Sequence, residues 1–110
     1  MLNKIISTYK TWSYMLRRKY YTAIALRRVK IHGKIVNVNN KSFFTVKCEF
    51  GNNVNFNGMK VKGFGKVSFG DNFHSGQECL IITHNHNYNG EMLPYDNTYI
   101  YKDVTIEDNV

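Results

Sequence analysis

Residues 69–88 read FGDNFHSGQECLIITHNHNY, and residues 106–110 read IEDNV. In and before the first stretch, similar residues recur at every sixth position, in two interleaved sets. These sets are Val61, Val67, Phe73 and Cys79, and Gly63, Phe69, Ser75 and Ile81. The match between FGDNF and IEDNV shows that this step of six resumes after an interruption. The sequence therefore predicts a repetitive scaffold with one loop grafted onto it.

A six-residue period is a known signature of parallel β-helices. One apolar residue on each flat face points inward, and a small or turn-permissive residue follows at each corner. Three faces make one coil, so inward residues of successive coils stack into a continuous core. Glycine and asparagine suit the corners because they tolerate positive φ. A β-sandwich would instead show longer strands with turn signals every eight to twelve residues.

The composition allows one domain with a modest core, since the chain has 110 residues. No segment approaches the roughly 20 apolar residues that a membrane span needs. The N-terminus is also a poor signal peptide, because it lacks a long apolar run and a cleavage site. Two cysteines, Cys48 and Cys79, do not make a disulfide framework. They indicate free thiols in a reducing cytoplasm.

Charge is divided unevenly along the chain. Residues 1–48 carry eleven Lys or Arg and no acid, whereas residues 49–110 carry four Lys and all eight acids. The basic excess therefore belongs to the N-terminal segment. No recognised nucleic-acid fold or motif accompanies it, so we expect no nucleic-acid partner.

Residues 1–32 are predicted to form a basic amphipathic helical segment, with the helix itself over residues 2–28. Apolar residues recur there at three- and four-residue steps, so they share one face. Such a helix could lie on an anionic membrane surface through residues 2–30. It could equally pack on the body of the protein or on a neighbouring subunit. The apolar positions are Leu2, Ile5, Ile6, Tyr9, Trp12, Leu16, Tyr20 and Ile24.

The part from about Gly51 to Val110 resembles the left-handed β-helix acyltransferases with hexapeptide repeats. Within that family, it is most similar to the sugar and capsule O-acetyltransferases of the galactoside and maltose acetyltransferase type. The resemblance is carried by FGDNFHSGQECLIITHNHNY and by LPYDNTYIYKDVTIEDNV at 93–110. It implies an all-β fold after the helix, with left-handed coils over residues 33–110 and an external loop at about 87–101. It also implies acetyl transfer from acetyl-CoA to a saccharide hydroxyl.

The family's catalytic histidine stands before the external loop, which corresponds to His86. Histidine is well matched to taking a hydroxyl proton at neutral pH, because its ordinary pKa lies near 6.5. Backbone N–H groups near the coil corners would stabilise charge on the thioester carbonyl. His84 lies on the same side of an extended segment, and we expect a supporting or structural role there. We count His84 and Asn85 among the residues that contact the acceptor.

The acceptor is expected to contact residues on both sides of this histidine. The family's acceptor-binding asparagine lies in an Asn-Phe-Asn triplet that matches Asn55 in VNFNGMKV at 54–61, if one extra residue is allowed around Gly58. Tyr95 and Asp96 lie in the loop and could hydrogen-bond a sugar, or they form only an external turn. The loop is short and rich in Tyr and Asn, so the identity of the acceptor cannot be inferred from the acceptors of the sugar acetyltransferases.

The resemblance further implies a homotrimer with its active site between adjacent subunits. The protein is expected in the cytoplasm, and near the inner face of the membrane if the helix binds lipid. The family continues past the equivalent of Val110 with coils that make most coenzyme contacts, so the chain corresponds to the front portion of such an enzyme. Two alternatives stay open. The chain could be a non-catalytic partner of intact homologues, or a zinc enzyme that uses His74, His84, His86 and Cys79. Because His-x-His alone is a weak metal motif, we expect no metal.

Overall fold

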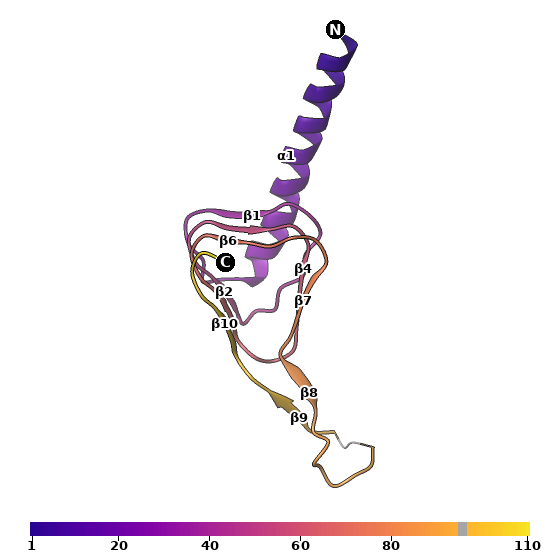
Figure 1. The fold of residues 1–110 in the computed structure, drawn as a ribbon, viewed down its shortest axis with the longest axis vertical. Coiled ribbons are helices and arrows are strands. Elements are labelled where there is room, and N and C mark those ends of the chain that lie inside the picture. The colour runs from indigo at the N-terminus through magenta and orange to yellow at the C-terminus, as the bar shows by residue number, and fades with distance from the viewer. Residues whose placement is uncertain (95–96) are drawn as a thin grey trace.

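The computed structural model describes residues 1–94 and 97–110. One long helix, α1 (Leu2–Arg28), is followed by many short strands in small sheets (Figure 1). The predicted helix over residues 2–28 is confirmed, and its segment contains no Gly or Pro. Val29 is extended and ends the helix, with Arg27 and Arg28 placed favourably at the negative end of the helix dipole. No helix in the described part of the chain is long and apolar enough to cross a membrane.

Eight of the ten strands in the described residues form three small parallel sheets. The first contains β1 (Val36–Val38), β3 (Val54–Phe56) and β6 (Phe73–His74). The second contains β2 (Cys48–Phe50), β5 (Val67–Phe69) and β10 (Val104–Ile106). The third contains β4 (Met59–Lys62) and β7 (Cys79–Ile82). From β2 onward the chain visits the second, first and third sheets in turn, and a bridge between Phe43 and Lys60 stands in place of a third-sheet strand between β1 and β2. A bridge between Ile31 and Glu49 extends the second sheet toward the helix.

Paired strands lie eighteen to twenty residues apart in the sequence, which is close to three of the predicted six-residue steps. The spacing rises to thirty-seven residues between β5 and β10, because the loop is inserted there. FGDNF and IEDNV pair across this gap, with Phe69 opposite Ile106. The interrupted six-residue pattern thus corresponds to the strand pairing that the structure shows.

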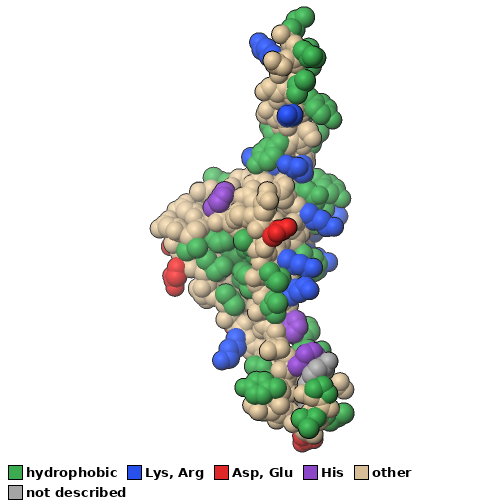
Figure 2. All heavy atoms as spheres, turned by 45° about the vertical axis from the view of Figure 1, so that its right-hand side comes forward, with side chains coloured by type: hydrophobic (Ala, Val, Ile, Leu, Met, Phe, Trp, Pro, Cys, Tyr) green, Lys and Arg blue, Asp and Glu red, His purple; other side chains and the backbone are tan. Residues whose placement is uncertain are grey.

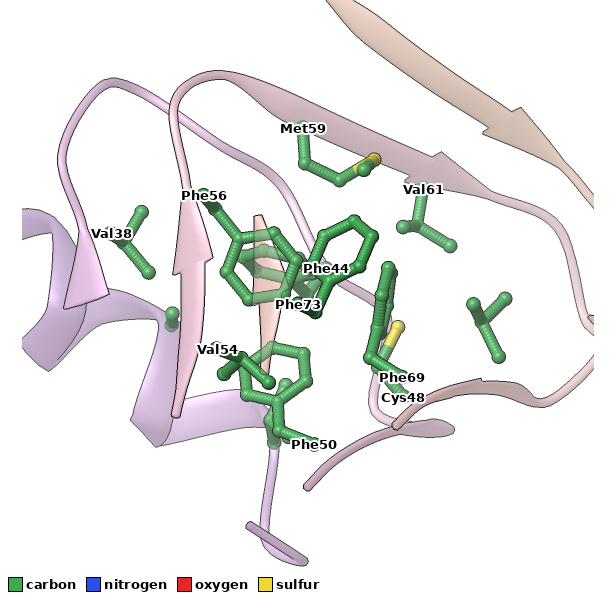
Figure 3. Close-up of a cluster of buried hydrophobic side chains, with 13 residues drawn as sticks. Val38, Phe44, Cys48, Phe50, Val54, Phe56, Met59, Val61, Phe69 and Phe73 are labelled. Carbon is green, nitrogen blue, oxygen red and sulfur yellow. The ribbon is translucent and has the colours of Figure 1, made fainter. Parts of the chain in front are cut away.

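The core is a stack of aromatic rings between the three sheets (Figure 3). Inward and outward positions alternate along the strands, as in β4, where Met59 and Val61 are buried and both lysines are exposed. Phe56 is fully buried and lies at the centre, with ring centroids of its neighbours 4.7 to 5.4 Å away. Those neighbours are Phe44, Phe50, Phe69 and Phe73.

Three asparagine residues lie at one corner of the chain path, in the turns next to β3, β6 and β10. Asn53, Asn72 and Asn109 have φ of 61°, 58° and 64°, the left-handed region that asparagine tolerates. The side-chain amide of Asn53 donates to Asn72 Oδ1 at 3.0 Å, and the amide of Asn72 donates to Asn109 Oδ1 at 3.0 Å. We call these three residues the asparagine column. The expectation that asparagine serves at corners is met at this corner.

The helix covers one end of the core, but not with its predicted apolar face. Ala25 and the following Val29 are buried in the core, Thr22 Oγ1 accepts the Val38 N–H at 2.9 Å, and Arg18 Nε donates to Asn39 at 2.8 Å. The apolar face from Leu2 to Tyr20 is 43% to 70% exposed. The helix therefore packs on the body of this chain through its C-terminal part only, and the face from Leu2 to Tyr20 does not take part in that packing.

The two thiols should differ in reactivity, because burial raises the pKa of the Cys48 thiol even though a hydrogen bond with Thr45 offsets part of this effect. Cys48 is 2% exposed, whereas Cys79 is only partly buried. The thiolate, not the thiol, attacks thiol reagents, so a raised pKa and burial both slow the reaction. At pH 8 we expect an aromatic disulfide reagent to modify Cys79 within minutes and Cys48 only after denaturation. Rapid reaction of Cys48 in the folded Cys79→Ser variant would contradict this placement.

Candidate functional site

A hairpin lies between β7 and β10, outside the three parallel sheets. Its strands are β8 (His84–His86) and β9 (Tyr99–Tyr101), which pair antiparallel. The hairpin projects away from the body at the end opposite the helix (Figure 1). The predicted loop at 87–101 is therefore the outer part of a longer excursion that begins at His84. The predicted acceptor residues Tyr95 and Asp96 lie outside the described residues.

Both histidines lie at the base of this hairpin and on one side of β8. Strand alternation places His84 and His86 together and turns Asn85 to the other side, where it is exposed. The Oδ1 atom of Asn85 accepts the N–H of His86 at 2.9 Å. The predicted pairing of the two imidazoles on one face is thus present, while Asn85 faces away from them.

Tyr99 packs against both imidazoles. Its ring centroid lies 5.5 Å from that of His84 and 4.9 Å from that of His86, its direct partner in the strand pairing. Phe64 packs on His84 from the coil side, with centroids 5.9 Å apart. The aromatic rings therefore limit the rotation of the histidines. Tyr99 and Phe64 are functional candidates that the sequence analysis missed.

Thr83 fixes the point at which the hairpin leaves the coils. Its buried hydroxyl donates to the carbonyl oxygen of Lys62 at 3.0 Å and accepts the N–H of Gly65 at 3.0 Å. Its own carbonyl accepts the N–H of Lys102, so both legs of the hairpin are tied to one residue. Gly63, with φ of 107°, passes close by, and an added Cβ would lie 2.6 Å from His84 Nδ1. Glycine is therefore required there.

A surface hollow of about 520 Å³ adjoins the hairpin base. His84 and Ile82 line it from one leg, and Ile100 and Lys102 line it from the other. Nδ1 of His84 is buried without a hydrogen-bond partner among the described residues. The hollow thus combines an imidazole, a cation and apolar side chains.

The outer face of the β4–β7 sheet leads from this hollow toward the helix. Lys60 pairs with Leu80 and Lys62 with Ile82, and all four side chains are exposed. A second hollow, of about 780 Å³, lies between this face and α1 and is lined in part by Arg17, Lys60 and Leu80. Figure 2 shows lysine and arginine side chains along this side, with histidines below them. We call Lys60, Lys62, Leu80 and Ile82 the β4–β7 face.

Asn55 and His74 lie elsewhere in the chain. They are paired residues of β3 and β6, in a different sheet from the hairpin. The Asn55 side chain accepts from Asn37 at 3.0 Å and donates to Asn53 at 3.2 Å. Within one chain, the structure does not bring Asn55 to His86. Among residues 1–94 and 97–110, no group of three or more His, Cys, Asp or Glu side chains is arranged to hold a metal ion.

A weak pattern in the sequence indicates that Tyr99 could contact the histidines. Tyr99-Ile100-Tyr101 alternates aromatic and aliphatic residues, and His84-Asn85-His86 precedes it across a polar loop. Two short extended runs around one loop are consistent with a hairpin.

A comparison of the chain with protein-family models, curated proteins and solved structures gives no match.

Proposed function

We propose that the strand-forming part of the chain is a left-handed parallel β-helix and that the protein is an acetyl-CoA-dependent O-acetyltransferase acting on a saccharide hydroxyl. Three observations support the coil architecture: parallel pairing, a step of eighteen to twenty residues, and cyclic visits to three sheets. The hexapeptide pattern agrees with this architecture, and the family resemblance adds the handedness and the chemistry.

The observation that carries the proposal is the position of the histidines. His84 and His86 stand at the one point between β1 and β10, within the described residues, where an antiparallel hairpin interrupts the parallel strands. The acyltransferases that this sequence resembles have their catalytic histidine before such a loop. Function is carried by specific sites on a fold rather than by the fold itself. Here the interruption brings together imidazoles, aromatic rings and a hollow.

In the proposed reaction, His86 acts as the general base. Its imidazole takes the proton of the acceptor hydroxyl while the hydroxyl oxygen bonds to the acyl carbon. The carbon–sulfur bond of the thioester breaks, and the coenzyme leaves as a thiol after it receives a proton. Tyr99 would position both imidazoles, and His84 would contact the acceptor in the hollow that it lines. No covalent enzyme intermediate is needed.

Acetyl-CoA supplies an activated acyl group on a long arm that ends in phosphates. The β4–β7 face suits such a molecule, because it presents two lysines and two aliphatic side chains immediately before the histidines. Lysine is a common partner of phosphate groups. The apolar part of the donor would contact Leu80 and Ile82, and its phosphates would contact Lys60 and Lys62.

A saccharide acceptor is favoured by the tyrosines of the hairpin. Tyr88, Tyr99 and Tyr101 are exposed, and each combines an apolar ring with a hydroxyl group. That combination matches a sugar, which has apolar C–H faces and polar edges. Asn55 would reach the same acceptor only from an adjacent subunit, which the proposed homotrimer would provide.

The test is a direct assay of acetyl transfer. The purified chain is incubated with acetyl-CoA and a panel of mono- and oligosaccharides, and both free coenzyme thiol and acetylated product are measured. We expect thiol release to depend on the acceptor and to equal the amount of O-acetyl product formed. Thiol release without product, or no transfer to any acceptor, would favour the alternative of a non-catalytic chain that associates with homologues.

A further inference from the structure

The exposed apolar face of α1 has no partner among the described residues. It consists of Leu2, Ile5, Ile6, Tyr9, Trp12, Leu16 and Tyr20, and we call it the apolar stripe. A stripe of seven large side chains on one helix is uncommon on a free surface and marks an interaction site. We propose that the apolar stripe binds the surface of an anionic phospholipid bilayer, with the helix lying in the plane of the interface. This inference does not depend on acyl transfer.

The geometry of the helix leaves the stripe accessible to a flat surface. At about 3.6 residues per turn, the side chains that join the helix to the body, among them Arg18, Thr22 and Ala25, lie on nearly the opposite side from the stripe. The body therefore sits behind the helix. A bilayer could contact the stripe along most of the helix length, which is about 40 Å for this number of residues, without meeting the coils.

The charge of the helix selects the kind of surface. Its sequence contains seven Lys or Arg and no acid. By the same helical geometry, Lys19 flanks the stripe on one side, and Lys10 and Arg17 flank it on the other. Long basic side chains beside an apolar stripe can extend to lipid phosphates while their stems stay in the interface. Each basic residue near an anionic membrane adds to the attraction.

A second copy of the chain fits the stripe less well. Helices of two copies that met through their stripes would bring their flanking cations together, and neither helix has an acid to pair with them. Nucleic acid would satisfy the cations but not the aliphatic and indole side chains. An anionic bilayer satisfies both features, because its phosphates meet the cations and its acyl boundary receives the stripe.

The test uses Trp12, the only tryptophan of the chain, which is 63% exposed. The full chain is mixed with vesicles of phosphatidylcholine alone, or with roughly one third phosphatidylglycerol. We expect flotation with the anionic vesicles only, a shift of Trp12 emission to shorter wavelength, and weaker binding at high salt. No flotation, or equal binding to both kinds of vesicle, would overturn the proposal.

Two matched variants separate the stripe from charge alone. Ile5→Glu with Tyr9→Glu places two acids on the stripe, and Ser7→Glu with Thr11→Glu places two acids at the same spacing on the opposite, exposed side. We expect the first variant to lose about a hundredfold in vesicle affinity and the second less than about tenfold. Equal losses of affinity would show that the helix binds by charge alone, and would overturn insertion of the apolar stripe.

Concentration-dependent self-association with a Trp12 shift in the absence of lipid would assign the stripe to a second copy instead. Circular dichroism checks that both variants keep the helix.

Discussion

Replacing His86 with alanine is expected to lower acetyl transfer about a thousandfold, within the range lost when a general base is removed. The acceptor hydroxyl would then have to lose its proton to water during attack. Binding of the donor should change little, because the proposed donor contacts lie on the β4–β7 face. The rate constant for turnover should therefore fall much more than the Michaelis constant for acetyl-CoA changes. Steady-state kinetics with the best acceptor of the panel measures both quantities.

His32→Ala is the matched control, because His32 is exposed and lies outside the hairpin and outside the sheet that contains Asn55. It removes the same side chain at a distance from the hairpin and should leave turnover unchanged. His84→Ala should give a smaller loss than His86→Ala, mainly in acceptor binding, since His84 lines the hollow. If the His86 variant keeps full activity, the general base lies elsewhere and the proposed mechanism fails. A larger loss of turnover in the His84 variant would mean that His84 is the general base and that His86 has the supporting role.

Replacing Phe56 with alanine is expected to lower the free energy of unfolding by about 4 kcal/mol. The ring is fully buried and touches four other phenylalanine rings, so its loss leaves a cavity that stacked coils cannot easily close. Domains of this size have total stabilities of about 5 to 15 kcal/mol, and the variant should be close to unfolding. Urea denaturation followed by circular dichroism measures the change.

Phe64→Ala removes the same ring from a position that is 58% exposed and should cost less than about 1 kcal/mol. Its ring packs on His84, so this variant should affect activity more than stability. Similar destabilisation by both substitutions would mean that Phe56 is not at the centre of the core. The pair therefore tests the ring stack independently of any enzymatic assay.

Much of the fold follows from local patterns. The helix over residues 2–28 was predictable because apolar residues recur at helical steps without Gly or Pro. The short strands followed from the step of six, whose inward positions Val61, Val67 and Phe73 are all buried. The same local requirements recur every six residues, so the pattern is repeated along the chain. Handedness depends on how the chain passes between sheets, and residue spacing does not encode it.

The site was harder to predict because it depends on contacts between distant residues. Tyr99 meets the histidines only through antiparallel pairing across the loop, and three-residue strands leave a weak pattern. The orientation of the helix was also hidden. The helix residues that face the core, such as Thr22 and Ala25, have small side chains. They are therefore less conspicuous in the sequence than the large apolar residues of the exposed stripe. Periodicity identified an apolar face without showing what that face contacts.

The asparagine column has a consequence for how the molecule unfolds. Each asparagine holds a left-handed backbone conformation that is supported by its neighbour in the next coil, from Asn53 through Asn72 to Asn109. In the proposed β-helix, neighbouring coils would therefore stabilise one another pairwise, as in other stacked repeats, rather than through one global set of contacts. An outer coil has one such neighbour and an inner coil has two. Local opening should start at the ends of the stack and move inward, with amide protons around Val54–Phe56 the last to exchange with solvent.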